Sequence, residues 1–273
     1  ELPGVQMDGS ELTPDGVLAL IGYGLAGLVG TVVGIVVALV ALQPAQSVVY
    51  DALYRPLGPW TATSAATVVQ FGAAGALALG LPVVAAEHLE RGRPEPAAAV
   101  LAAGVLALVA VLLVAVAAGV PAVLAAVAGD VLFVAAAYLA LGRVGASRGG
   151  RAAFVGGAPA LALLLVLLAV GLGWGGGYDV VAEPAPDATA ANADFADAPK
   201  LRADLFAPGA CEDGVCRLAL RQYEHEAAAG RFLDDNGVRC PLAAAPSADD
   251  RGGSFVATHD GDRYRLTCEA YGD

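Results

Sequence analysis

Long uncharged runs dominate the first two thirds of this chain. A bilayer core about 30 Å thick is crossed by about 20 apolar helical residues. Five runs reach that length: Gly16–Leu42, Ala62–Ala86, Ala97–Gly119, Pro121–Leu141 and Ala152–Trp174. The third and fourth runs are separated only by "AGVP", which predicts a tight helical hairpin. The sequence therefore predicts an all-α polytopic membrane bundle of five transmembrane helices over residues 16–174.

The charge distribution separates this bundle from a polar tail. Charged residues make up only 15% of the chain, whereas soluble domains contain about 25%, and most of the charge lies after Gly175. The net charge is -12, and Lys200 is the only lysine among 15 basic residues. This acidic, arginine-rich and alanine-rich composition resembles that of halophilic archaeal proteins. It argues against nucleic acid as a partner, because phosphate binding needs a basic patch.

Loop arginines predict the direction of the chain through the membrane. The loop Gly142–Arg151 carries three arginines, Glu87–Pro96 carries two, and Gln43–Trp60 carries one. Cytoplasmic loops are enriched in Lys and Arg, so the first two loops and residues 1–15 are expected in the cytoplasm and the C-terminal tail outside the cell. Aromatic rings at the ends of the spans would then lie at the membrane interface: Tyr50, Tyr54, Trp60 and Trp174.

Met7 is the only methionine. One interpretation takes it as the initiator, with residues 1–6 foreign to the native chain. The alternative is a signal peptide removed before Glu1, which would reverse the orientation and which the loop arginines oppose.

The tail divides into two predicted parts. Residues 175–208 are rich in Gly, Ala, Pro and Asp without periodicity, which predicts a solvated linker. Residues 209–273 are expected to form a small α+β domain outside the cell. In it, Cys216–Leu233 suits a strand followed by a short helix, and Gly253–Tyr271 alternates around an Asp-Gly turn as a β-hairpin does.

All four cysteines lie in this predicted domain. A zinc ribbon carries two C-x2-C knuckles, which are missing here, so disulfides formed in an oxidising exterior are the favoured interpretation and zinc the alternative. The turn sequence "EDGV" favours the pair Cys211–Cys216. Cys240 follows a predicted strand and Cys268 ends the hairpin, which favours the pair Cys240–Cys268.

Small residues recur at every fourth position in two spans. Such stripes let helices approach closely in lipid, so we expect them to mediate packing within the chain or, as an alternative, docking of another subunit. The stripe positions are Gly22, Ala26, Gly30, Gly34 and Ala38 in the first span, and Gly72, Ala76 and Gly80 in the second.

Asp130 is the one acidic residue deep within a predicted span. A charged aspartate at the centre of a helix opposes insertion by about 2.5–3.5 kcal/mol, and no span carries a Lys or Arg at mid-depth to neutralise it. We therefore expect Asp130 to face the bundle and to be protonated or hydrogen-bonded. Its expected partners are Gln70, Tyr23, Thr31 and Tyr138.

The leading hypothesis is a non-enzymatic accessory or assembly subunit of the cell membrane, with the lipid bilayer and either a membrane-protein partner or a second copy of itself as partners. One alternative is a small transporter or proton-coupled channel that uses Asp130, and another is a membrane-anchored sensor. No catalytic motif, cofactor motif or metal-ligand pattern occurs in the sequence; "HEAAAG", for example, lacks the second histidine of H-E-x-x-H.

Overall fold

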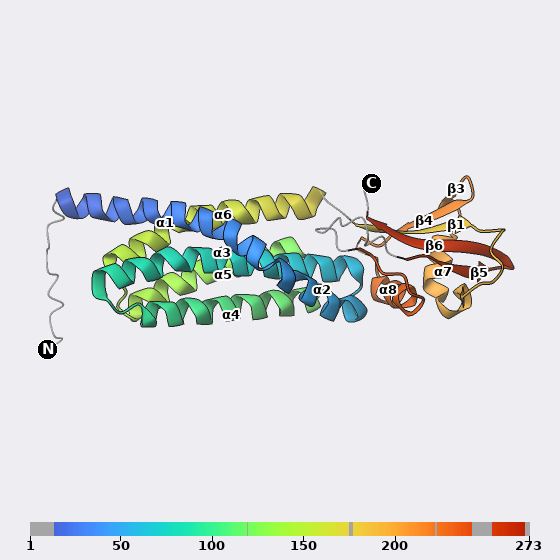
Figure 1. Cartoon of the computed structure of the whole chain (residues 1–273), viewed down its shortest axis with the longest axis horizontal. Helices are drawn as coiled ribbons and strands as arrows, with labels where there is room; N and C mark the ends of the chain where they lie inside the picture. The colour runs from blue at the N-terminus through green and yellow to red at the C-terminus, as the bar shows by residue number, and fades with distance from the viewer. Residues whose placement is uncertain (1–13, 119, 175–176, 222, 242–252, 271–273) are drawn as a thin grey trace, which may run out of the picture. The chain divides into compact units, whose positions relative to one another are not determined.

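The computed structural model describes residues 14–118, 120–174, 177–221, 223–241 and 253–270 (Figure 1). The contacts divide the chain into two compact units. Unit 1 comprises residues 1–40, 73–108 and 130–164. Unit 2 comprises residues 41–72, 109–129 and 165–273.

Six helices fill the first two thirds of the chain: α1 (Pro14–Ala41), α2 (Gln43–Leu57), α3 (Pro59–Arg91), α4 (Glu95–Ala117), α5 (Ala122–Arg143) and α6 (Arg148–Trp174). In the described part of the chain, four helical segments are long and apolar enough to cross a membrane: Gly16–Ala41, Pro59–Arg91, Glu95–Ala115 and Val123–Arg143. The chain is therefore a multi-pass membrane-associated protein. The fifth predicted span coincides with α6, and its crossing stays a prediction.

The stretch Gln43–Trp60, expected to be a loop, instead contains the 15-residue helix α2. Pro44 suits its first turn, where a missing N–H does no harm, and Gly58 ends it with a positive φ of 88°. Its buried side chains recur at every fourth position, namely Gln46, Tyr50 and Tyr54. This spacing gives α2 one buried face.

In unit 1, α1 contacts α6 at glycine residues, which have no side chain to keep the two backbones apart. A Cβ atom on Gly27 would lie 2.8 Å from Cα of Ala153, and one on Gly156 would lie 2.6 Å from the carbonyl carbon of Gly24. Real Cβ atoms do not approach backbone this closely, so these glycines permit the contact. Farther along α1, a Cβ on Gly34 would lie 2.9 Å from Cβ of Ala78 in α3.

The predicted stripe on α1 matches these contacts only in part. Gly30 and Gly34 pack against α3 and Ala38 is half-buried, but Gly22 and Ala26 are exposed. The contact face of α1 turns from α6 to α3 along its length, so a single four-residue repeat does not follow it. The predicted stripe on α3 is buried throughout: Gly72, Ala76 and Gly80.

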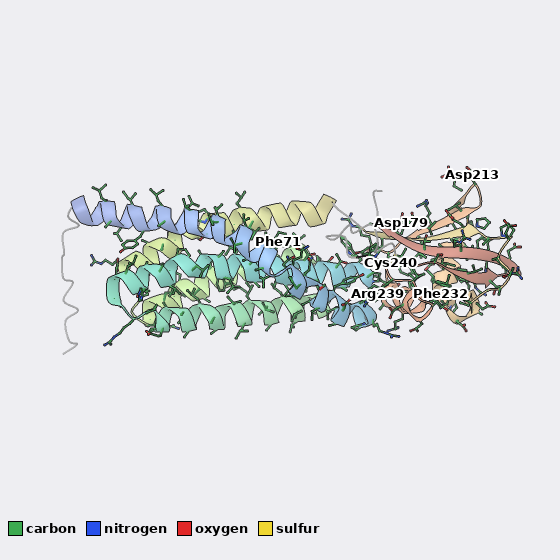
Figure 2. All side chains as sticks on the ribbon, viewed as in Figure 1. Phe71, Asp179, Asp213, Phe232, Arg239 and Cys240 are labelled. Carbon is green, nitrogen blue, oxygen red and sulfur yellow. A yellow bond between two sulfur atoms is a disulfide. The ribbon has the colours of Figure 1, made fainter. Side chains whose placement is uncertain are left out.

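Unit 2 contains a six-stranded sheet in the order β2-β5-β6-β1-β4-β3, antiparallel except for the β2–β5 pair. The strands are β1 (Tyr178–Pro184), β2 (Ala193–Asp194), β3 (Cys211–Glu212), β4 (Val215–Ala219), β5 (Phe255–His259) and β6 (Asp262–Ala270). The accompanying helices are η1 (Phe195–Asp197), α7 (Pro199–Leu205) and α8 (Glu226–Asp235). Asp213 lies at the turn between β3 and β4 (Figure 2). We call residues 178–270 the C-terminal domain.

The predicted linker over residues 175–208 is wrong. It contains β1, a central strand that pairs with both β4 and β6, so that Val180 lies opposite Leu218 and Cys268. The uninterrupted apolar stretch in β1 is only Val180–Ala182, and all three of its residues are buried. Because consecutive residues of this short strand are buried, its sequence lacks the alternation of apolar and polar residues that predicts a strand. The surrounding Pro, Ala and Asp residues instead favoured a linker.

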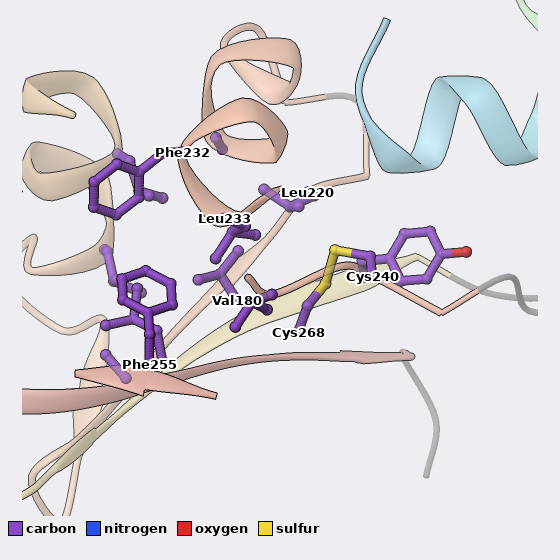
Figure 3. Close-up of a cluster of buried hydrophobic side chains, with 14 of the residues drawn as sticks. Val180, Leu220, Phe232, Leu233, Cys240, Phe255 and Cys268 are labelled. Carbon is purple, nitrogen blue, oxygen red and sulfur yellow. A yellow bond between two sulfur atoms is a disulfide. The ribbon is translucent and has the colours of Figure 1, made fainter. Parts of the chain in front are cut away.

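Other predictions for the domain are confirmed. Cys216–Leu233 contains strand β4 followed by helix α8, and β5 and β6 form the expected hairpin. Asp260 and Gly261 turn it with positive φ angles of 50° and 91°, which is the geometry of a two-residue hairpin loop. Buried side chains from α8 and the sheet, including Phe232, Leu233 and Phe255, meet in one core (Figure 3).

Both expected disulfides are present, Cys211–Cys216 and Cys240–Cys268. The first closes the β3–β4 hairpin, where its two cysteines lie directly opposite each other. The second joins β6 to the segment after α8 and is part of the core (Figure 3). The strand expected before Cys240 is missing, because residues 238–241 have no regular secondary structure.

Candidate functional site

Asp130 lies on the inner face of α5. Its side chain is buried, with 2% exposure, and it shares this face with buried Ala126, Phe133 and Ala137. Within the described residues its Oδ1 atom has no hydrogen-bond partner. Asp130 is therefore buried in protein, as expected for a carboxyl group deep in a span, while its role stays a prediction.

Two of the residues expected to bond Asp130, Tyr23 and Tyr138, have other neighbours. Tyr23 hydrogen-bonds the side chain of Glu90 near the end of α3. Tyr138 is 43% exposed and its ring lies 6.5 Å from that of Phe154. Thr31 is fully buried, and its Oγ1 atom also lacks a partner within the described residues. Gln70 lies half-buried in α3.

A second candidate site joins α2 to the C-terminal domain. Tyr50 and Tyr54 are buried to 4% and 0% exposure in the same hydrophobic core as Tyr178, Leu220 and Leu233. Both tyrosines were expected at the lipid interface. They are instead core residues, because α2 lays its buried face on the domain.

The two tyrosine hydroxyl groups hold the backbone of Cys240. Tyr50 donates to the carbonyl oxygen of Cys240 over 2.7 Å, and the N–H of Cys240 donates to the hydroxyl oxygen of Tyr54 over 3.2 Å. Burial raises the pKa of Tyr54 to about 12, so its hydroxyl stays neutral at physiological pH. The pair satisfies an irregular backbone segment as a neighbouring strand would.

Ion pairs of opposite polarity between α2 and the domain surround these tyrosines. Arg55 of α2 contacts Asp235 at 2.5 Å and Asp234 at 3.5 Å, while Arg239 of the domain contacts Asp51 of α2 at 2.9 Å. The Arg239 guanidinium also lies 4.7 Å from the ring centre of Tyr54. Each of these half-exposed ion pairs contributes little to the free energy of unfolding. Because α2 supplies the cation in one pair and the anion in the other, the two pairs together favour one position of α2 on the domain.

Glu226, the first residue of α8, caps the start of α3. Its Oε1 and Oε2 atoms accept hydrogen bonds of 2.9 Å from the backbone N–H and the hydroxyl of Thr61, and the N–H of Trp60 also donates to it. A Cβ on Gly58 would lie 2.7 Å from Cγ of Glu226. Gly58 thus permits the turn, and its lack of a side chain leaves room for the Glu226 carboxylate to reach the N–H groups in the first turn of α3.

We expect the docking of α2 and α3 on the C-terminal domain to strengthen as the pH falls from 8 to 5. Burial raises the pKa of Glu226 from 4.5 to about 7, even though the bonds from Thr61 lower it. Between pH 4.5 and about pH 7, the folded state therefore holds a proton on Glu226 that the unfolded state has released. The free energy of unfolding consequently falls as the pH rises through about 7. The largest resulting change in the free energy of unfolding is about 3 kcal/mol.

Urea unfolding followed by tryptophan fluorescence at pH 5 and pH 8 measures this dependence, since Trp60 lies 5.6 Å from the Arg221 guanidinium in the interface. Glu226→Gln, which cannot ionise, should flatten the profile. The exposed Glu224→Gln serves as the matched control and should leave it unchanged. Equal pH profiles for Glu226→Gln and the wild type would contradict the assignment.

A third cluster lies where α3 ends and α6 begins, within unit 1. Glu87, which is 3% exposed, accepts a hydrogen bond of 2.5 Å from the N–H of Ser147, and Ser147 Oγ accepts one of 2.9 Å from Gly150. Arg91 donates to the carbonyl oxygen of Gly145. Carboxylates from one helix thus cap the N-terminus of another at this cluster as well as at Glu226.

Within the described residues, no group of His, Cys, Asp and Glu could hold a metal ion. Sequence reasoning missed Glu226 and Glu87 because a cap donated from a distant helix leaves no local pattern. The burial of Tyr50 and Tyr54 had a signal, namely the four-residue spacing along Gln43–Leu57.

Comparison with models of known protein families, with curated proteins and with solved structures found no match.

Proposed function

We propose that this protein is a non-enzymatic accessory or assembly subunit of the cell membrane: a five-helix bundle that holds an acidic, disulfide-stapled domain outside the cell for a membrane-protein partner. The observation that carries the proposal is the core shared by α2 and the C-terminal domain. A domain held through buried tyrosines, ion pairs and a helix cap presents its surface at a fixed position on its anchor. This suits a docking platform better than a domain on a loose tether.

The same core supports the fifth membrane span. Residues that share a core lie on the same side of the bilayer, so the chain between α2 and the C-terminal domain must cross an even number of times. Three of the four candidate spans, within α3, α4 and α5, lie between them. A crossing by α6 makes the number even, and the loop arginines then favour a cytoplasmic N-terminus and an external domain.

Cysteine labelling in intact cells tests this topology. Ser147 is unsuitable as a labelling position because it is 2% exposed and caps α6. The exposed Val144 in the same loop is the better position. The native cysteines are paired and give no background. An impermeant maleimide should label Lys200→Cys and spare Val144→Cys until the cells are permeabilised. The reverse pattern would refute the orientation, and equal labelling of both would refute the fifth span.

Purification in mild detergent followed by mass spectrometry tests the accessory role. We expect a second membrane protein in fixed stoichiometry with the wild type, and its loss from a variant in which the domain is released from α2. A chain that purifies alone, or a partner retained equally by both forms, would count against an external docking domain.

A transporter or proton-coupled channel is the second candidate, and Asp130 is the observation that favours it. Buried carboxylates within membrane spans mark proton or ion pathways in many transporters, and Oδ1 of Asp130 lacks a partner within the described residues.

Asp130→Asn distinguishes the two functions. Because the amide is close in size to a protonated carboxyl group, we expect the unfolding free energy to change by about 1 kcal/mol or less. Thermal unfolding in detergent measures the stability, and a pH-sensitive dye in proteoliposomes measures proton flux. Loss of a wild-type flux with stability intact would establish the transporter. A loss of several kcal/mol would instead mean that the carboxylate is ionised and paired.

A further inference from the structure

A groove of about 420 Å³ opens within unit 1 between α1, the end of α3 and the start of α6. One wall is apolar and comes from α1, with Gly16, Ala19 and Leu20. The other wall is polar and includes Glu90, Arg91 and Arg148. The groove is thus amphipathic across its width.

The surroundings of the groove place it beside lipid. Leu18 and Ile21, neighbours of the apolar wall on α1, are 66% and 54% exposed, as expected for a helix that contacts bilayer chains. The polar wall belongs to the two arginine-rich loops that the positive-inside rule assigns to the cytoplasm. The cytoplasmic leaflet is also the one that carries anionic lipids.

The polar wall suits a phosphodiester. The lining contains two guanidinium groups and one carboxylate, and the Glu90 carboxylate already accepts hydrogen bonds from Tyr23 and from the N–H of Gly149. Arg91 uses one of its N–H groups on Gly145, and a guanidinium has five. A free phosphate ion would leave the apolar wall unused, whereas a phospholipid fills both walls.

We propose that this groove binds one anionic phospholipid of the cytoplasmic leaflet, with its phosphate at Arg91 and Arg148 and an acyl chain along Gly16–Leu20 of α1. The site is independent of the external domain and of any partner bound there. It rests only on the membrane topology.

Native mass spectrometry of the full chain in detergent, titrated with dioleoyl phosphatidylglycerol or dioleoyl phosphatidylcholine, tests the proposal. We expect one retained phosphatidylglycerol per chain and weaker retention of phosphatidylcholine. Arg148→Gln should weaken binding of the anionic lipid about fivefold, the factor expected for one basic residue near a membrane surface. The exposed Arg93→Gln, in the loop between α3 and α4 and outside the groove lining, is the matched control and should bind as the wild type does.

Leu20→Trp provides a variant that fills the groove without changing its charge, and it should also reduce retention. It keeps the test decisive if Arg148→Gln does not fold. Equal weakening by Arg93→Gln would mean nonspecific attraction and would overturn the proposal. Displacement of the lipid by millimolar inorganic phosphate, or unchanged binding to Leu20→Trp, would show that the site is not one for a lipid.

Discussion

Replacing Tyr54 by alanine is expected to lower the unfolding free energy of the C-terminal domain by about 3–5 kcal/mol, the range for removing a large buried aromatic side chain. Tyr54 is fully buried between α2 and the domain. Its loss opens a cavity, leaves the N–H of Cys240 without its acceptor, and removes the ring nearest to the Arg239 guanidinium. The domain should then separate from α2.

Urea unfolding followed by tryptophan fluorescence measures this effect. Val48→Ala is the matched control on the same helix, because Val48 is 67% exposed, and it should change stability by about 0.5 kcal/mol or less. Tyr54→Phe keeps the ring and removes only the hydroxyl, so we expect an intermediate loss of about 1–3 kcal/mol. A Tyr54→Ala protein as stable as Val48→Ala would mean that α2 does not hold the domain, and the shared core would then no longer support a fifth span.

Replacing Gly156 by alanine is expected to separate α1 from α6. The new Cβ would lie 2.6 Å from the carbonyl carbon of Gly24, and backbone atoms cannot move aside as a side chain can. Overpacking of this kind lowers stability by about 1–3 kcal/mol. The change opposes helix propensity, which by itself favours alanine over glycine by about 1 kcal/mol.

The control has the opposite expected sign. Gly22→Ala on α1 introduces a Cβ with nothing within 4 Å, so it should leave stability unchanged or raise it slightly. Thermal unfolding of both variants in the same detergent compares them directly. Stabilisation by both alanines would show that α1 and α6 do not meet at Gly24 and Gly156.

The sequence by itself determined the features that depend on local composition or on neighbours in the chain. Apolar length predicted the long helices α1, α3, α4, α5 and α6 but not α2, since a bilayer imposes a minimum number of apolar residues on a span. Asp-Gly predicted the β5–β6 turn, and "EDGV" predicted the Cys211–Cys216 pair, because turn geometry is set by a few adjacent residues. The burial of Asp130 followed from the free energy of exposing a carboxyl group to lipid.

The tertiary structure alone decided what depends on partners far away in the chain. Strand β1 is stabilised by β4 and β6 on either side, so the short run Tyr178–Ala182 becomes a central strand despite linker-like surroundings. Glu226 meets Thr61 across 165 positions of sequence, and Tyr50 meets Cys240 across 190. Such contacts form because burial leaves polar groups that must be satisfied by whatever the fold brings near. A pattern of neighbouring residues carries no record of these pairings. The four-residue spacing along α2 does indicate a buried face, but only the fold decided that the C-terminal domain rather than the lipid interface covers Tyr50 and Tyr54.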